Sequence, residues 1–198
     1  DVYKRQVDYK TGSKKFDLRE VYYGLDCQML LYLFTLERNG GHLFSQGTAA
    51  GVEYLWADPA PENIIRPETD DAELLQAQNY PLEGLLLDEP SIYHAMDTRG
   101  TGAFVPLSFS AKTGEPTAQS AKARLADREK FNRIRDHLDG MLTDMAKNLY
   151  SGEIDAAPLV PNAGKSPCLW CEYRTVCRHA DGEGERTPLK PDDPFGAE

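Results

Sequence analysis

The sequence has no run of about 18 apolar residues, the minimum for a helix that crosses a bilayer, so a membrane-spanning helix is excluded. It begins at Asp1 with no basic segment followed by an apolar stretch, so no secretory signal peptide is expected. These absences favour a soluble protein.

Basic residues are also in short supply. The 198 residues carry 22 Lys and Arg against 32 Asp and Glu, a formal net charge of −10. This is the wrong sign for a free-standing protein that binds nucleic acid by general electrostatic attraction. Any contact with DNA must therefore be made by a local part of the surface, or be shared with a partner protein.

Only four cysteines are present, and their spacing argues against disulfides. Cys27 lies far upstream, within an apolar helical pattern, whereas Cys168, Cys171 and Cys177 fall within ten residues. Three thiols so close together indicate a metal site, which suits a reducing, cytoplasmic setting. The spacing does not separate zinc from iron: His179 would complete a Cys3His zinc site, whereas an iron–sulfur cluster prefers a fourth cysteine.

Hydrophobic patterning predicts an α/β domain over residues 7–180, preceded by a candidate non-native junction at residues 1–6 and followed by a disordered tail at residues 181–198. Helices are expected at residues 17–38 and 127–150, where apolar residues recur at helical spacing. Strands are expected around Val7, at residues 50–57, 85–87 and 103–109, with an exposed acidic excursion at residues 62–82.

Asp8 and Lys10 form the first candidate catalytic pair. Alternation along a strand places both side chains on the same face. A carboxylate can help to hold a hard divalent cation, and an ammonium group can orient a water or stabilise charge on a phosphoryl oxygen. The alternative is an ordinary solvated strand face, because Asp-x-Lys is a common sequence.

Gln28 and Tyr32 form the second candidate pair. They are four residues apart and therefore lie on one face of the expected helix. Polar groups on an otherwise apolar helix need partners, which a site containing Asp8 and Lys10 would provide. A core Gln beside a core Tyr is the alternative.

Taken together and in this order, Asp8-Tyr-Lys10-Thr-Gly, Gln28-x3-Tyr32 and Cys168-x2-Cys171-x5-Cys177 resemble the RecB-like branch of the PD-(D/E)XK nucleases. The resemblance covers about residues 7 to 179 and is supported by four shorter stretches: residues 50–54, 84–88, 95–97 and 151–154. It implies a restriction-endonuclease-like core, N-terminally truncated, that ends in a cysteine-rich cluster-binding segment.

By this resemblance, Asp8 and the backbone carbonyl of Tyr9 are Mg²⁺ ligands, Lys10 acts at the water or the developing charge, and Gln28 and Tyr32 shape the site. The three cysteines become three of four ligands of a [4Fe–4S] cluster that acts as a structural clip. In this family the fourth cysteine, an acidic metal ligand and a helicase-like region lie upstream, so neither Cys27 nor His179 is the expected ligand, and the isolated chain is expected to be inactive.

The implied function is that of a DNA exonuclease domain in an ATP-dependent helicase–nuclease that processes double-strand breaks for recombinational repair. The implied partners are DNA ends, a single strand at the nuclease site and an AddA-like helicase/nuclease protein that completes a heterodimer. Two alternatives stay open at this point: a non-catalytic DNA-binding scaffold of the same complex, and a zinc-binding interaction domain.

Overall fold

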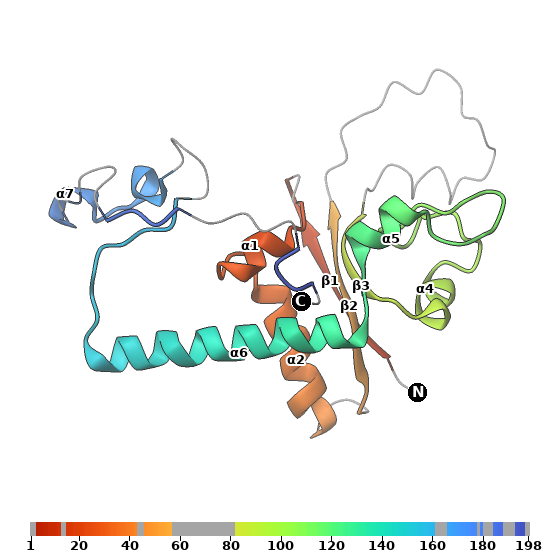
Figure 1. Cartoon of the computed structure of the whole chain (residues 1–198), viewed down its shortest axis with the longest axis horizontal. Coiled ribbons are helices and arrows are strands. Elements are labelled where there is room, and N and C mark those ends of the chain that lie inside the picture. The colour runs from red at the N-terminus through yellow and green to blue at the C-terminus, as the bar shows by residue number, and fades with distance from the viewer. Residues whose placement is uncertain are drawn as a thin grey trace, which may run out of the picture.

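The computed structural model describes residues 3–12, 15–42, 46–56, 82–160, 166–177, 179, 184–187 and 193–196. A four-stranded mixed sheet lies at the centre, with helices on both of its faces (Figure 1). The expected α/β class is confirmed. The expected excursion at residues 62–82 falls outside the described residues, apart from Leu82.

The sheet follows the order of the sequence. Strand β1 (Tyr3–Lys10) pairs in parallel with β2 (Thr48–Trp56), β2 pairs antiparallel with β3 (Leu82–Leu87), and β3 pairs in parallel with the short β4 (Leu125–Ala126). The strands expected around Val7 and at residues 50–57 and 85–87 are therefore present. Residues 3–6 belong to β1, and the non-native origin of residues 1–6 stays a prediction.

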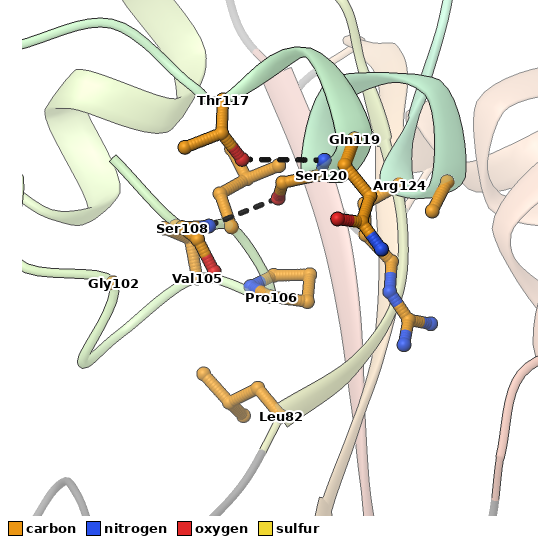
Figure 2. Close-up of a pocket in the computed structure, with 11 residues that line it drawn as sticks. Leu82, Gly102, Val105, Pro106, Ser108, Thr117, Gln119, Ser120 and Arg124 are labelled. Atoms are coloured by element: carbon orange, nitrogen blue, oxygen red, sulfur yellow. Dashed lines mark hydrogen bonds between the residues drawn. The ribbon is translucent and has the colours of Figure 1, made fainter. Parts of the chain in front are cut away.

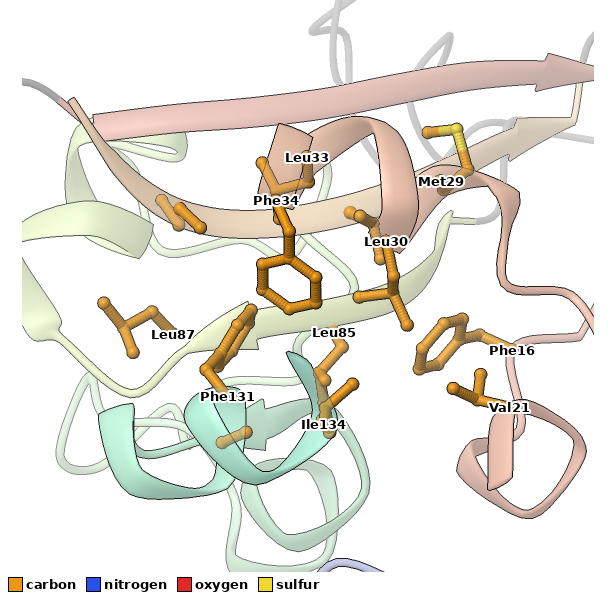
Figure 3. Close-up of a cluster of buried hydrophobic side chains, with 14 of the residues drawn as sticks. Phe16, Val21, Met29, Leu30, Leu33, Phe34, Leu85, Leu87, Phe131 and Ile134 are labelled. Atoms are coloured by element: carbon orange, nitrogen blue, oxygen red, sulfur yellow. The ribbon is translucent and has the colours of Figure 1, made fainter. Parts of the chain in front are cut away.

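One face of the sheet is covered by α1 (Leu18–Tyr22), α2 (Gln28–Asn39) and α6 (Arg128–Ser151), and the main core lies beneath them. In this core Phe34 of α2 meets Phe131 of α6 at a ring distance of 6.3 Å, with Leu30, Ile134 and Leu85 packed around them (Figure 3). A short 3-10 helix, η1 (Gly40–His42), follows α2.

The single helix expected over residues 17–38 is wrong, because the chain breaks between α1 and α2. Gly24 adopts φ 80° and Asp26 adopts φ 55°, both in the left-handed region that ends a helix. The apolar pattern continues through the break because the residues on both sides pack into the same core: Val21, Cys27, Met29 and Leu30 are all buried.

The opposite face is covered by α4 (Pro90–Met96) and α5 (Ala118–Arg124). The strand expected at residues 103–109 is wrong: this stretch forms bends and one isolated bridge between Phe109 and Pro116. Pro106 has no N–H to donate to a ladder. Val105 and Leu107 are nevertheless buried in a second apolar cluster, so packing alone accounts for their alternation.

Helix α6 is 24 residues long and begins at Asp127, whose side chain accepts a hydrogen bond from the Lys130 N–H at 2.6 Å. It ends at Ser151 and is followed by Gly152 in the left-handed conformation. Only its first half is packed: Phe131, Ile134 and Leu138 are buried, but Met145 and Leu149 are 60% and 77% exposed. Within the described residues, no helix is sufficiently long and apolar to cross a membrane.

Beyond α6, the chain forms a small segment at the far end of the molecule from α4, containing the 3-10 helix η2 (Pro167–Trp170) and α7 (Arg174–Cys177) (Figure 1). Further along, residues 193–196 return to the main core, which differs from the expectation that residues 181–198 have almost nothing to bury. Phe195 is 3% exposed, and its carbonyl accepts a hydrogen bond from Arg133 Nε at 2.9 Å. Asp193 forms an ion pair with Lys130 at 2.8 Å.

Phe195→Ala is expected to reduce the free energy of unfolding by about 3 kcal/mol, because it removes a buried ring that packs edge-on against Tyr22 and His137. The matched control is Tyr150→Ala, which truncates a side chain that is 93% exposed and should change stability by less than about 0.5 kcal/mol. Urea unfolding followed by circular dichroism measures both. Equal stability of the two variants would show that residues 193–196 contribute nothing to the fold.

Candidate functional site

Asp8 and Lys10 lie at the end of β1 and are brought together. Lys10 Nζ is 2.6 Å from Asp8 Oδ2, and both side chains are about one-third exposed, at 32% for Asp8 and 35% for Lys10. The alternation expected of a strand therefore does place them on one face. The partial exposure of this ion pair leaves both groups open to a ligand from solvent.

The face that carries this pair is the one covered by α2. Lys10 Nζ lies 5.5 Å from the centre of the Tyr54 ring, and Tyr54 of β2 is buried in the main core with Met29 and Leu30 of α2. Burial raises the pKa of the Tyr54 hydroxyl to about 12, and the negative charges of Asp26 and Asp8 add to this shift. Tyr54 therefore stays a neutral phenol beneath the ammonium group of Lys10.

Asp26 is a residue of this site that sequence reasoning missed. Its negative charge adds to the raised pKa of Tyr54, as that of Asp8 does. Its φ of 55° is unusual for a residue with a side chain. Such conformations are concentrated at functional sites, and Asp tolerates them better than most residues. The only signal in the sequence was its position two residues before Gln28.

Gln28 and Tyr32 are brought together at the first turns of α2. Gln28 Nε2 donates a hydrogen bond to Tyr32 Oη at 2.9 Å, and Tyr32 is 49% exposed. The alternative of a core Gln beside a core Tyr is therefore wrong, because both side chains face outward. The hydrogen bond satisfies part of the hydrogen-bonding capacity of both side chains. The pair stays accessible at the start of α2, next to Asp26 in the chain.

The three clustered cysteines lie on one segment, distant from this site (Figure 1). The backbone N–H of Cys171 donates to the Cys168 carbonyl at 3.3 Å, and that of Cys177 donates to the Tyr173 carbonyl at 2.8 Å, so consecutive turns carry the thiols. All three are free and at least partly exposed. Cys27 instead lies in the main core, where burial raises the pKa of its thiol to about 11.

Among the described residues, no group of three or more His, Cys, Asp or Glu side chains is arranged to hold a metal ion. The donor types still fit the groups implied by the resemblance, since thiolates suit an iron–sulfur cluster and a carboxylate with a carbonyl oxygen suits Mg²⁺. The Tyr9 side chain is 68% exposed, and its backbone carbonyl stays the predicted ligand atom.

Glu53, the neighbour of Tyr54 on β2, is 1% exposed and forms an ion pair with Arg5 at 2.8 Å. Burial raises the pKa of its carboxyl group from 4.5 to about 7, although the charge of Arg5 opposes the shift. The folded protein thus binds a proton that the unfolded chain releases between these two pH values. Protonated Glu53 favours folding, so stability should fall as the pH rises through this window.

The expected loss in the free energy of unfolding between pH 4.5 and pH 8 is about 3 kcal/mol. Glu53→Gln removes the titrating group and should flatten this dependence. Urea unfolding at several pH values tests the prediction through the slope, whatever the absolute stability of the variant. A wild-type curve as flat as that of the variant would show that Glu53 ionises normally.

The chain that carries these residues matches a known protein family. The family model described as the PD-(D/E)XK nuclease superfamily matches residues 2–178. The chain belongs to this superfamily.

Similar proteins of known name agree with this membership. The chain is 30% identical over 184 residues to a protein of Exiguobacterium sibiricum and 31% identical over 185 residues to one of Thermoanaerobacter sp., each named as the B subunit of an ATP-dependent helicase/deoxyribonuclease. A protein of the same name from Clostridium botulinum is 29% identical over 181 residues. These matches cover 89% to 90% of this chain but only 15% to 16% of each relative, so the chain spans about one-sixth of their length.

Proposed function

We propose that this chain is the Mg²⁺-dependent DNA exonuclease domain of a helicase–nuclease that processes double-strand breaks for recombinational repair. The observation that carries the proposal is the Asp8–Lys10 ion pair at 2.6 Å, exposed at the end of β1 in a chain of the PD-(D/E)XK nuclease superfamily. The relatives are named as one subunit of a helicase/deoxyribonuclease, which supports a larger assembly with an AddA-like partner.

In the proposed reaction, water attacks the phosphorus of a DNA phosphodiester and the bond from phosphorus to the leaving oxygen breaks. Asp8 and the Tyr9 carbonyl would hold Mg²⁺, which when bound supplies an activated water and charge stabilisation. Lys10 orients the attacking water or stabilises the charge that grows on the phosphoryl oxygen. Tyr54, as a neutral phenol, places no negative charge against that ammonium.

Gln28 and Tyr32 would shape the site and the path of the strand. Their mutual hydrogen bond fixes the orientation of both polar ends, at a position accessible to a ligand. The [4Fe–4S] cluster on Cys168, Cys171 and Cys177 would have no part in the chemistry, since the segment of η2 and α7 lies apart from β1 (Figure 1). Its proposed role is that of a clip that anchors the end of the domain.

One observation favours a second function, that of a non-catalytic DNA-holding scaffold. Among the described residues, no three metal-binding side chains meet around one point, so Asp8 has no second and third side-chain ligand. A cleavage assay distinguishes the two functions. The full-length protein, assembled with its AddA-like partner and supplied with linear duplex DNA and ATP, should release nucleotides in Mg²⁺ and none in EDTA. Unwinding without any release of nucleotides would establish the scaffold.

A further inference from the structure

A groove of about 610 Å³ lies between the start of α1 and α5. Its walls carry five basic side chains and three acidic ones, in a chain whose net charge is −10. The basic residues are Lys15, Arg19, Lys122, Arg124 and Lys130. The groove is therefore a local concentration of positive charge on an acidic molecule.

Two of these cations are available to a ligand. Lys15 and Lys122 are exposed, and neither has an ion-pair partner in the part of the chain that the structure describes. The other three hold acidic residues of the same groove: Arg19 pairs with Asp17 at 2.6 Å, Lys130 pairs with Asp193 at 2.8 Å, and Arg124 pairs with Glu83. The positive charge of the groove that is available to a ligand thus comes from Lys15 on one wall and Lys122 on the other.

The walls are held together by Glu83 on β3. Its Oε2 lies 2.5 Å from Arg124 Nη1 of α5 and accepts a hydrogen bond from the backbone N–H of Phe16, at 3.4 Å, in the segment before α1. The Glu83 side chain is 17% exposed, so this link is partly shielded from water. The groove is preformed, and a ligand would not need to order it at an entropic cost.

The groove continues along α5. A second pocket of about 480 Å³ shares Gln119, Ala123 and Arg124 with it and extends toward Ser108 and Ser120 (Figure 2). Ser120 is fixed there, since its hydroxyl accepts a hydrogen bond from the Ser108 N–H at 2.9 Å. Two pockets joined along one helix form an elongated track, which suits a linear polymer better than a single small anion.

The track runs toward the candidate catalytic pair. Asp8 lies opposite Tyr54 in the pairing of β1 with β2, and Tyr54 lies opposite Glu83 in the pairing of β2 with β3. Opposite residues in a sheet point to the same face, so the three side chains form a row across three strands. Phe16 of the groove also packs against Tyr54, with ring centres 6.3 Å apart.

We propose that this groove binds the phosphodiester backbone of a DNA strand and leads it along α5 toward Asp8 and Lys10. The identity of the polymer rests on the proposed function. Lys15 and Lys122 contact phosphates from opposite walls, and Gln119 and Ser120 offer neutral polar groups to the backbone. The contacts are to phosphate and sugar, so they carry no sequence preference.

Binding without catalysis tests the groove. The full chain is titrated in EDTA with a fluorescent single-stranded oligonucleotide of about 20 nucleotides and, in a second arm, with the matching duplex. The double variant Lys15→Gln with Lys122→Gln should weaken binding about tenfold and lower the salt slope of log K by about 2, one for each lost phosphate contact. The control is Lys147→Gln on the distant half of α6, a lysine that is also exposed, at 70%.

The outcomes are separable from those of the cleavage assay, because EDTA removes the metal and no bond is broken. The proposal is supported if the double variant binds DNA more weakly and with a smaller salt slope while the Lys147 variant is unchanged. The oligonucleotide that shows the larger effect, single-stranded or duplex, is then the ligand of the groove. An unchanged double variant, or a wild-type chain that binds neither DNA, overturns it. Circular dichroism of each variant verifies that the comparison is between folded proteins.

Discussion

The Lys10→Ala variant of the full-length protein is expected to lose DNA cleavage by at least about a thousandfold while it keeps its complex with the AddA-like partner. The ammonium group stands 2.6 Å from the Asp8 carboxylate, and in the proposed reaction it would stabilise the negative charge that develops on the phosphoryl oxygen. Removing one such stabilising group from an active site typically lowers the rate by two to three orders of magnitude, about 10² to 10³. The loss of water positioning adds to this effect.

The variant is not expected to lose its fold. Lys10 is the last residue of β1, its side chain is 35% exposed, and its Asp8 partner is also open to water. Exposed ion pairs contribute about 1 kcal/mol or less to stability. A single-turnover assay with Lys147→Ala as the control separates catalysis from general loss of charge. If the Lys10→Ala variant still cleaved DNA, the assignment of Asp8 and Lys10 as the catalytic pair would be wrong, and the scaffold function would be left in its place.

The second large effect is expected at the cysteines. Cys171→Ala, made in the full-length protein, should abolish the absorbance at roughly 400 nm that a cysteine-ligated iron cluster shows. It should also lower the midpoint of thermal unfolding, because the proposed clip is lost. Cys171 is exposed and lies between the turns that carry Cys168 and Cys177, so its substitution disturbs little apart from the ligand set.

Cys27→Ala is the matched control for this experiment. Its thiol lies in the main core, with its pKa raised to about 11 by burial, and so it is unsuited to act as a thiolate ligand. The control should keep the absorbance even if it loses some stability. A colourless wild-type protein that contains zinc would instead establish the zinc-binding alternative, and survival of both folding and DNA processing in Cys171→Ala would contradict the clip.

The elements that the sequence predicted well are those with a strong local signal. Helix α6 has a capping Asp127, a terminal Gly152 and a regular apolar spacing, and these fix its ends to within one or two residues. Alternation and turn residues located β2 to within two residues at each end, whereas β1 begins at Tyr3, four residues upstream of the expected start of the domain. The pairing of Asp8 with Lys10 follows from strand geometry alone, and the contact of Gln28 with Tyr32 follows from helix geometry.

The failures share a different cause, because each depends on contacts between distant parts of the chain. Met145 and Leu149 continue the apolar spacing of α6 but extend past the sheet that buries its first half. Tyr54 became part of the candidate site only through its neighbours on β1 and α2. Phe195 stood alone in a polar segment, and its burial depends on a space beside Tyr22 and His137 that no local pattern reveals.

The length of α6 has a mechanical consequence. At about 1.5 Å per residue, its 24 residues form a rod of about 36 Å, anchored at one end by Phe131, Ile134 and Leu138. A tilt of about 5° at the anchored end displaces the far end by about 3 Å, since displacement scales with the length of the rod. Helix α6 therefore acts as a lever between the core and residues 166–177, which carry the three clustered cysteines. A small torque applied to these residues would be transmitted to the core beside β3 and β4.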